Sequence, residues 1–489
     1  MTSRVNNTAE REIRVTADAQ PPAGCRQACT LVALQDIDMT RATNGGAMGR
    51  SGPHTEKSEN RNEVLCKHLE RLDWSLRGFA HRVRERCEAV GVPHTVSPST
   101  VSRWCTSNAK PGAELAAAVC HVLSSALRRH VTPESLGWSS DTTRIAAESL
   151  EYRDVAHAVH MLSKLWTLDA MRKRTVVQSA FSASVFGVAS REALVMPPDT
   201  VISGRGPYKV SAADIDLLDD QTRLFGKLDA QYGGGKFRSV FSSFLATHAA
   251  PMLNGTFSTR RGHRLFGSVV DAVLTVASMA YDDQLPGLAQ RYDLQAMRLA
   301  QAIGDRARIT RVHIHQARLA ATQGGRDDVL AHARSAVLAA AGAPQLVRAY
   351  AAITEARAWA LNDSPAQVLD AVSRARDHFQ RARPSTTPAW IAWFDRPELE
   401  GQAAWALAVA GLAEPGTQAL KETTNLPSKR TRDAVELLIT GAELARLRGD
   451  TAEHTSLTSR ASLLSQHLQS RRLTERIGRL LAGEPLHDF

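Results

Sequence analysis

Apolar positions recur along this chain with the period of α-helices. Between residues 75 and 89, Leu76, Phe79, Ala80 and Val83 occupy positions i, i+3, i+4 and i+7. An α-helix turns about 100° per residue, so this spacing places all four side chains on one face of a helix. A lead-in helix is expected over residues 62–72.

A second helix of the same region is expected to begin at Pro98. Ser97 is a favoured N-cap residue, and proline is favoured at the first helical position. The helical period then separates two faces. The buried face holds Val101, Trp104 and Cys105. The solvent-facing side holds small hydroxyl groups and one arginine: Ser99, Ser102, Arg103 and Thr106.

These two helices predict a helix-turn-helix that binds the major groove of DNA. Small side chains allow the second helix to approach the bases closely, and an arginine can bond to a guanine edge or a phosphate. A connector over residues 91–96 joins the helices, and a fourth helix is expected over residues 111–127. Its buried face consists of Leu115, Val119, Val122 and Leu123.

The distribution of charge favours an anionic partner. The chain has 60 Lys and Arg against 50 Asp and Glu, with a pI near 9.5. Residues 61–130 contain eleven Lys and Arg but six Asp and Glu. A solvated helix surface can show the same excess. Because this excess coincides with the helix pattern, it supports phosphate contacts.

Three short sequences in this region, Trp74–Arg77, Ser99–Trp104 and Val131–Gly137, resemble the actinobacterial members of the XRE (Cro/repressor-like) transcription regulators. The likeness covers residues 72–137. Two features depart from the simplest members of that family. The second helix and its connector are longer than their tight turn, and Ser107–Lys110 replaces the glycine-containing turn that usually follows the recognition helix.

The resemblance implies a set of DNA-binding residues. Four of them would lie at base edges, and three basic side chains of the same segment complete the set: Ser99, Thr100, Ser102, Arg103, Arg77, Arg82 and Lys110. One helix-turn-helix contacts only a few base pairs, so sequence specificity calls for a homodimer.

The chain divides into regions of different pattern. The first region lacks sustained periodicity and is expected to be disordered, and Met48 is a possible alternative start within it. A concentration of Pro and Gly near residues 195–210 marks a later boundary. The predicted regions are a leader (1–58), a DNA-binding domain (60–140), a helical bridge or linker (141–210), a helical-repeat domain (211–475) and a tail (476–489).

The repeat domain is predicted from breaks between alanine-rich helices. The breaks lie at residues 280–282, 321–324, 360–362, 410–411 and 447–449, about 40 residues apart, as in helix–turn–helix solenoids. A second amphipathic helix follows each break: Leu288–Ile303, Val329–Ala340, Val368–Arg381, Thr417–Thr423 and Ser456–Gln469. The pattern resembles degenerate tetratricopeptide repeats, with a single irregular helical bundle as the alternative. The expected fold class is therefore all-α, with an N-terminal helix-turn-helix bundle followed by a solenoid.

Within this domain, Leu228–Gly235, Leu265–Gly267, Met279–Asp282 and Gly287–Tyr292 resemble one subgroup of large regulators. It is the NsdA-type family, which controls sporulation and antibiotic production in Streptomyces and its relatives. The resemblance implies control of differentiation and secondary metabolism, often as repression.

No residue constellation predicts an enzyme. His313 and His315 share a helix, where positions i and i+2 point apart, so a shared metal is not expected. The segment Gly233–Lys236 lacks the earlier glycine of a phosphate-binding loop, and Phe237 replaces its Ser or Thr. It is expected to end a helix. No catalytic residue, metal site or cofactor is predicted.

The cysteines are expected to be core thiols. Four of the six fall at apolar helix positions, where a free cysteine behaves as a small buried hydrophobe: Cys66, Cys87, Cys105 and Cys120. Cys25 and Cys29 lie in the leader and have no second pair with which to form a zinc site.

Two groups of residues are candidates for ligand contact. Trp390, Trp393 and Phe394 form an aromatic cluster that either fills the core or lines a ligand or peptide pocket. Candidates for the inner face of the repeats are Tyr232, Tyr281, Arg311 and Tyr350.

The leading prediction is a sequence-specific transcription regulator. Its partners would be double-stranded DNA, a second copy of the chain, and a peptide, protein or small-molecule effector at the repeat domain. No run of about 18 apolar residues predicts a membrane helix, and no secretory signal is recognised. The expected location is therefore the cytoplasm, at the nucleoid. The alternative is a repeat scaffold that does not bind specific DNA.

Overall fold

The computed structural model describes residues 62–89, 96–107, 109–129, 131–138, 141–199, 202–423 and 430–486. These residues are all-α apart from one antiparallel ribbon, β1 (Gly204–Arg205) paired with β2 (Thr256–Phe257). The predicted leader, Cys25, Cys29 and Met48 lie outside the described residues, as does most of the connector 91–96. We call residues 62–138 the small domain and residues 141–486 the helical body.

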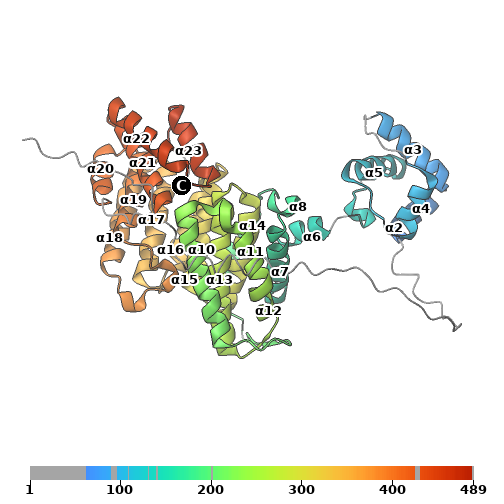
Figure 1. The fold of residues 1–489 in the computed structure, drawn as a ribbon, viewed down its shortest axis with the longest axis horizontal. Helices are drawn as coiled ribbons and strands as arrows, with labels where there is room; N and C mark the ends of the chain where they lie inside the picture. The colour runs from blue at the N-terminus through green and yellow to red at the C-terminus, as the bar shows by residue number, and fades with distance from the viewer. Residues whose placement is uncertain are drawn as a thin grey trace, which may run out of the picture. The chain divides into compact units, whose positions relative to one another are not determined.

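The small domain consists of four helices and a short 3-10 turn around one apolar cluster (Figure 1). The α3 helix packs against α4 and α5, and α2 packs against α4. The four predicted core cysteines are all buried and unpaired by disulfides, which confirms that expectation. The elements are α2 (Glu63–Arg71), α3 (Leu76–Ala89), α4 (Pro98–Thr106), α5 (Ala113–Leu127) and η2 (Glu134–Leu136).

Asn62 connects three parts of the small domain. Its side-chain oxygen accepts a hydrogen bond from Leu65 N (3.0 Å) and caps α2. Its amide nitrogen donates to Leu136 O (2.7 Å), and its backbone N–H donates to Cys105 O (2.9 Å) at the end of α4. One buried residue therefore holds the start of α2, the end of α4 and η2 together.

We expect Asn62→Ala to destabilise the small domain by about 1–2 kcal/mol, because it removes an N-cap and leaves Leu136 O without its buried donor. Hydrogen exchange on the full chain would show α2 amides exchanging about 5- to 30-fold faster. Lys67→Ala is the control, since it removes only an exposed ion pair with Glu63 on the same helix, which is worth little. Equal exchange in both variants would contradict the role given to Asn62.

The segment predicted as a bridge is part of the helical body. The α7 helix packs against α11 and α14, and side chains from residues 146–193 belong to the same apolar cluster as α13 and α14. Long-range hydrogen bonds hold it there, including Arg291 Nε to Ala146 O (2.9 Å) and Gln295 Nε2 to Ser149 O (2.8 Å). The linker prediction for residues 141–210 is therefore corrected. Its helices are α6 (Asp141–Glu148), α7 (Val155–Ala170), α8 (Arg174–Val177) and α9 (Val185–Val195).

Gly233 ends α10 (Ala212–Tyr232), as predicted, with a positive φ of 85°. The next helix, α11 (Gly234–Phe244), begins at once. A side chain at Gly234 would have its Cβ 2.6 Å from the backbone of Met279, so only glycine fits there. After α11 follow a π-helical turn, η3 (Leu245–Ala249), and α12 (Ala250–Leu253).

Five helix pairs follow, and each pair packs within itself. The turns between the paired helices lie at or next to the five predicted breaks, which confirms those positions. Gly324, Gly411 and Gly449 have φ of 74–76° at three of the turns, a conformation that costs glycine little. The pairs are α13 (Thr259–Asp282) with α14 (Pro286–Ala302), α15 (Arg306–Thr322) with α16 (Arg326–Ala339), α17 (Gln345–Leu361) with α18 (Pro365–Gln380), α19 (Arg396–Val409) with α20 (Ala413–Lys421), and α21 (Thr431–Leu447) with α22 (Thr451–Ser465).

Several boundaries differ from the prediction: α16 and α18 begin three residues earlier than expected, and α22 begins five residues before Ser456. The α20 helix begins four residues before Thr417 because Pro415, within its first turn, needs no intrahelical donor there. Residues 476–481, predicted as tail, form the second half of α23 (Arg471–Leu481), whose Ile477 and Leu480 are buried.

The α13 helix is long and apolar enough to cross a membrane by length and composition, and it is the one such helix among the described residues. However, 83% of its most apolar window is buried inside the fold. In this structure α13 is the central core helix of the body.

Candidate nucleic-acid interface and central cavity

The start of α4 is fixed by a capping box. Thr100 N donates to Ser97 Oγ (3.2 Å), and Ser97 N donates to Thr100 Oγ1 (3.4 Å). The Thr100 hydroxyl is therefore engaged at the N-cap and half-buried, although the sequence placed it at a base edge. Ser97 Oγ also lies 2.7 Å from the exposed Ser99 Oγ.

The predicted buried face of α4 is confirmed. Val101, Trp104 and Cys105 are all buried. Trp104 meets Trp138 edge to face, with ring centroids 5.6 Å apart. This contact joins α4 to the segment that follows η2 and fixes the rotation of α4 about its axis.

The opposite side of α4 is open to solvent. Ser99 and Arg103 are exposed and Ser102 is half-buried. The Arg103 guanidinium forms neither a hydrogen bond nor an ion pair with any residue in the described part of the chain. The structure therefore leaves this guanidinium available to a partner.

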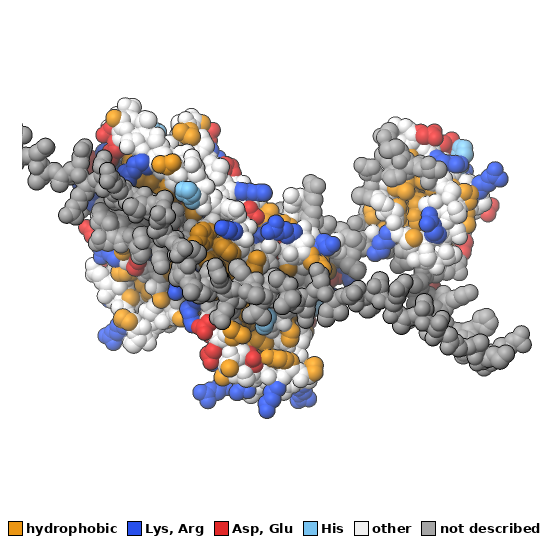
Figure 2. All heavy atoms as spheres, in the orientation of Figure 1, with side chains coloured by type: hydrophobic (Ala, Val, Ile, Leu, Met, Phe, Trp, Pro, Cys, Tyr) orange, Lys and Arg blue, Asp and Glu red, His pale blue; other side chains and the backbone are white. Residues whose placement is uncertain are grey.

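The other predicted DNA contacts lie on α3 and after α4. Arg77 and Lys110 are exposed. Arg82 is exposed but held in place, because its guanidinium lies 4.4 Å from the centroid of the Trp74 ring and donates to Gly78 O (3.1 Å). Figure 2 shows Lys and Arg side chains on the visible face of the small domain. That these residues bind DNA remains a prediction.

The prediction for the buried face of α3 was wrong for one residue, Leu76. Leu76 is 38% exposed, whereas Phe79, Ala80 and Val83 are buried. Leu76 is the first residue of α3 and has no preceding turn to pack against. Trp74 takes its place by stacking on Phe79 at 5.8 Å.

A second candidate site is a cavity of about 860 Å³ in the helical body. Its walls come from α10, from the segment 389–393, and from the first helix of every pair: α13, α15, α17, α19 and α21. None of the described lining residues belongs to a second helix. We call this space the central cavity.

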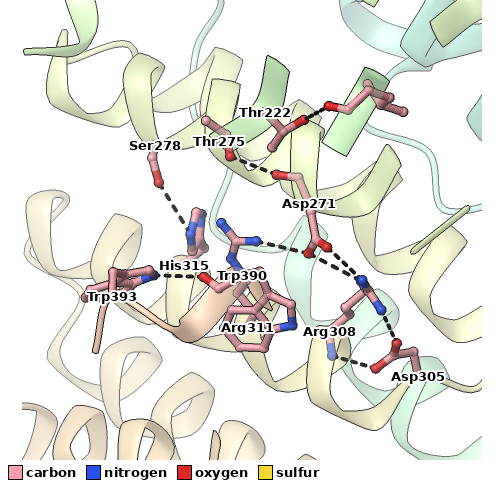
Figure 3. Close-up of polar contacts among 11 residues, drawn as sticks. Thr222, Asp271, Thr275, Ser278, Asp305, Arg308, Arg311, His315, Trp390 and Trp393 are labelled. Carbon is pink, nitrogen blue, oxygen red and sulfur yellow. Dashed lines mark hydrogen bonds and ion pairs between the residues drawn. The ribbon is translucent and has the colours of Figure 1, made fainter. Parts of the chain in front are cut away.

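Asp271 is the hub of one wall (Figure 3). Its carboxylate accepts hydrogen bonds from Arg308 at 2.7 and 3.2 Å and from Arg311 at 3.1 Å. Burial lowers the pKa of Arg311, and Asp271 partly opposes that shift. The Arg311 guanidinium also lies 5.0 Å from the Trp390 ring centroid.

The predicted aromatic cluster divides between core and cavity. Phe394 is buried in the apolar core, while Trp390 and Trp393 line the cavity. Trp393 Nε1 donates to Trp390 O (2.9 Å), as Figure 3 shows. Tyr350 meets Trp393 edge to face at 5.5 Å. Both alternatives left open by the sequence thus hold, for different residues.

The predicted inner-face residues are only partly brought together. Arg311 and Tyr350 line the central cavity. Tyr281 lines a different cavity of about 630 Å³. Tyr232 is among the lining residues of neither cavity, and its ring lies 5.0 Å from Lys236 Nζ.

His313 and His315 point to different surroundings, as their spacing predicts. His315 lies 3.4 Å from Ser278 Oγ at the cavity (Figure 3), whereas His313 stacks on His332 at 6.4 Å in the core. Within the described residues no group of three or more His, Cys, Asp or Glu is placed to hold a metal ion.

Sequence reasoning missed Arg318, Arg357, Trp405 and Glu398, which also line the cavity. Arg311, His315 and Arg318 are spaced i, i+4 and i+7, so they form a polar stripe along one face of α15. That stripe was the available signal. Burial, helped by neighbouring Asp433 and opposed by Arg430, raises the pKa of Glu398 to about 7.

Residues 65–139 match the family described as SP15 N-terminal domain. This range nearly coincides with the apolar cluster of the small domain. None of the curated proteins or solved structures compared with the chain matches it.

Proposed function

We propose that the chain is a sequence-specific DNA-binding transcription regulator without enzymatic activity. In this proposal the small domain is an XRE-type helix-turn-helix, and α4 is its recognition helix. The helical body is a tetratricopeptide-like solenoid that dimerises and binds an effector or partner. The protein would act at the nucleoid in the cytoplasm, in differentiation and secondary metabolism.

The observation that carries this proposal is the two-sided α4. Its buried side is fixed by Trp104 and its start by the Ser97 cap, so its exposed side is held in a defined orientation. That side presents Ser99, Ser102 and an unpaired Arg103. A rigid helix with small hydroxyls and one free guanidinium suits the major groove.

The test uses DNA that the full-length protein itself selects from a random-sequence library. We expect Arg103→Ala to weaken binding to the selected DNA about 10- to 100-fold, the loss of one bidentate base contact. Fluorescence anisotropy over a range of salt concentrations measures the effect. Wild-type affinity should fall steeply with salt.

The matched control is Arg381→Ala. Arg381 is an exposed arginine in the helical body, on a loose ion pair with Asp377 (3.7 Å), so its loss should leave DNA affinity unchanged. Failure to select any DNA sequence would refute the function. Wild-type affinity in both Arg103→Ala and Ser99→Ala would refute the assignment of α4.

A further inference from the structure

We propose that the central cavity binds a small organic anion with a planar, unsaturated body, such as an aromatic carboxylate. This deepens the effector part of the proposed function and rests on it for biological meaning. The binding itself is a property of the helical body and can be measured without DNA.

The size and position of the cavity fit one small molecule. Its volume of about 860 Å³ lies within the range of small-molecule sites, about 300–1,000 Å³. Five first helices and α10 enclose it. A ligand of this size would contact several helix pairs at once.

The charges that line the cavity favour an anion. Among the described residues, nine Lys and Arg side chains line it, against six Asp and Glu. Every one of the six carboxylates lies within 4 Å of an arginine, for example Asp229 with Arg432 (2.6 Å) and Asp433 with Arg430 (2.6 Å). The acidic groups of the lining are therefore paired by the fold, and Arg223, Arg264 and Arg308 are paired in turn with aspartates outside the lining.

The arginine that we assign to the ligand is Arg318. It follows Arg311 by seven residues on α15, so both side chains share the cavity face of the helix. The Arg318 guanidinium lies 4.7 Å from the Tyr281 ring centroid. It makes no hydrogen bond or ion pair with any residue that the structure describes. A guanidinium with five unused N–H donors matches a carboxylate bidentately.

The aromatic walls fit a planar body. Trp390 and Trp393 are held relative to each other by the hydrogen bond from Trp393 Nε1 to Trp390 O, and Trp405 lines the space from α19. Indole rings give a large, rigid contact area and stack on flat, unsaturated groups. An anionic group at Arg318 and a flat body against the indoles together define the ligand class.

The test is calorimetric titration of the full chain with 2-naphthoate and with its neutral isostere, 2-naphthamide. Both share the planar body, and only the acid carries a charge. We expect the acid to bind at least tenfold more tightly than the amide. Absence of binding by the acid up to about 5 mM, a very weak affinity, or equal binding of acid and amide, would overturn the proposal.

Two variants locate the site. Arg318→Gln should weaken the binding of 2-naphthoate about tenfold and leave the binding of 2-naphthamide unchanged. Trp393→Ala should weaken the binding of both compounds. Trp393 is 43% exposed, so its replacement should not unfold the protein. Arg381→Gln, at the C-cap of α18 and outside the cavity lining, should alter neither affinity. If 2-naphthoate binds equally well to wild type, Arg318→Gln and Trp393→Ala, the cavity is not its site.

These results separate the two proposals. Tight binding of 2-naphthoate by a protein that selects no DNA would support the cavity and refute the regulator. Selective DNA binding with no binding of the acid would do the reverse.

Discussion

Asp169→Asn is expected to destabilise the helical body by about 3–5 kcal/mol, the usual effect of removing one partner of a buried ion pair. Asp169 is fully buried and accepts hydrogen bonds from Arg238, from Ser242 Oγ (2.8 Å) and from Tyr292 Oη (2.9 Å). Without the carboxylate, the Arg238 charge remains in the core, and Asp283, at 3.6 Å, is its one remaining ion-pair partner among the described residues. Urea denaturation of the full chain measures the loss.

Asp377→Asn is the matched control, because the same substitution there removes an exposed ion pair with Arg381. Its expected effect is below about 1 kcal/mol. Adding Arg238→Met to Asp169→Asn should recover part of the stability, since it removes the uncompensated charge. Equal urea midpoints for Asp169→Asn and Asp377→Asn would show that the buried network contributes nothing.

The second large effect concerns acid stability. Burial lowers the pKa of His313 to about 3, with His332 adding to the shift, and burial lowers the pKa of His332 to about 4. Both are neutral in the folded state. In the unfolded state each would titrate near 6.5, so the unfolded state binds more protons between these values. The stability contribution is therefore present at neutral pH and is lost as the pH falls below about 6.5.

Lowering the pH from 7 to 5 should reduce the free energy of unfolding by about 2 kcal/mol for each of these two histidines, or about 4 kcal/mol together. Glu398, whose raised pKa acts in the opposite direction, makes a difference measurement necessary. When the pH is lowered from 7 to 5, the free energy of unfolding of a His313→Phe, His332→Phe double variant should fall by about 4 kcal/mol less than that of wild type. Urea denaturation at both pH values would show it.

His248→Phe is the control, since His248 is exposed on the π-helical turn. It should follow wild type at both pH values. If the double variant and wild type lose the same free energy of unfolding between pH 7 and pH 5, protonation of the two buried histidines does not contribute to acid unfolding.

The sequence predicted the features that depend on local signals. The α4 start follows from Ser97 and Pro98, and the turns after α15, α19 and α21 follow from glycines with positive φ. Each of these signals acts within a few residues, so no knowledge of the rest of the fold is required.

The predictions were wrong where contacts between residues far apart in the sequence determine the structure. The segment 141–210 looked like a linker because its hydrogen bonds, such as Ser182 N to Gln290 Oε1 (2.9 Å), connect residues more than 100 positions apart. Periodicity cannot show them. Leu76 had the correct spacing, but its place at the first turn of α3 leaves it partly exposed.

The central cavity could be anticipated only in part. Arg311 and Arg318 look the same in sequence whether their helix face meets solvent or an internal space. What distinguishes the two cases is the set of helices opposite, contributed here by α10, α19 and α21. The local hints were the aromatic pair Trp390 and Trp393 and the polar stripe of α15.

The restriction of the cavity wall to first helices has a consequence for how this protein can change. Second helices such as α16 and α18 contribute none of the described lining residues, so substitutions on their outer faces leave the chemistry of the cavity intact. Natural selection on ligand binding in the cavity and natural selection on partner binding at the outer surface therefore act on different sets of residues. Related chains could keep one ligand while exchanging partners, or keep one partner while exchanging ligands.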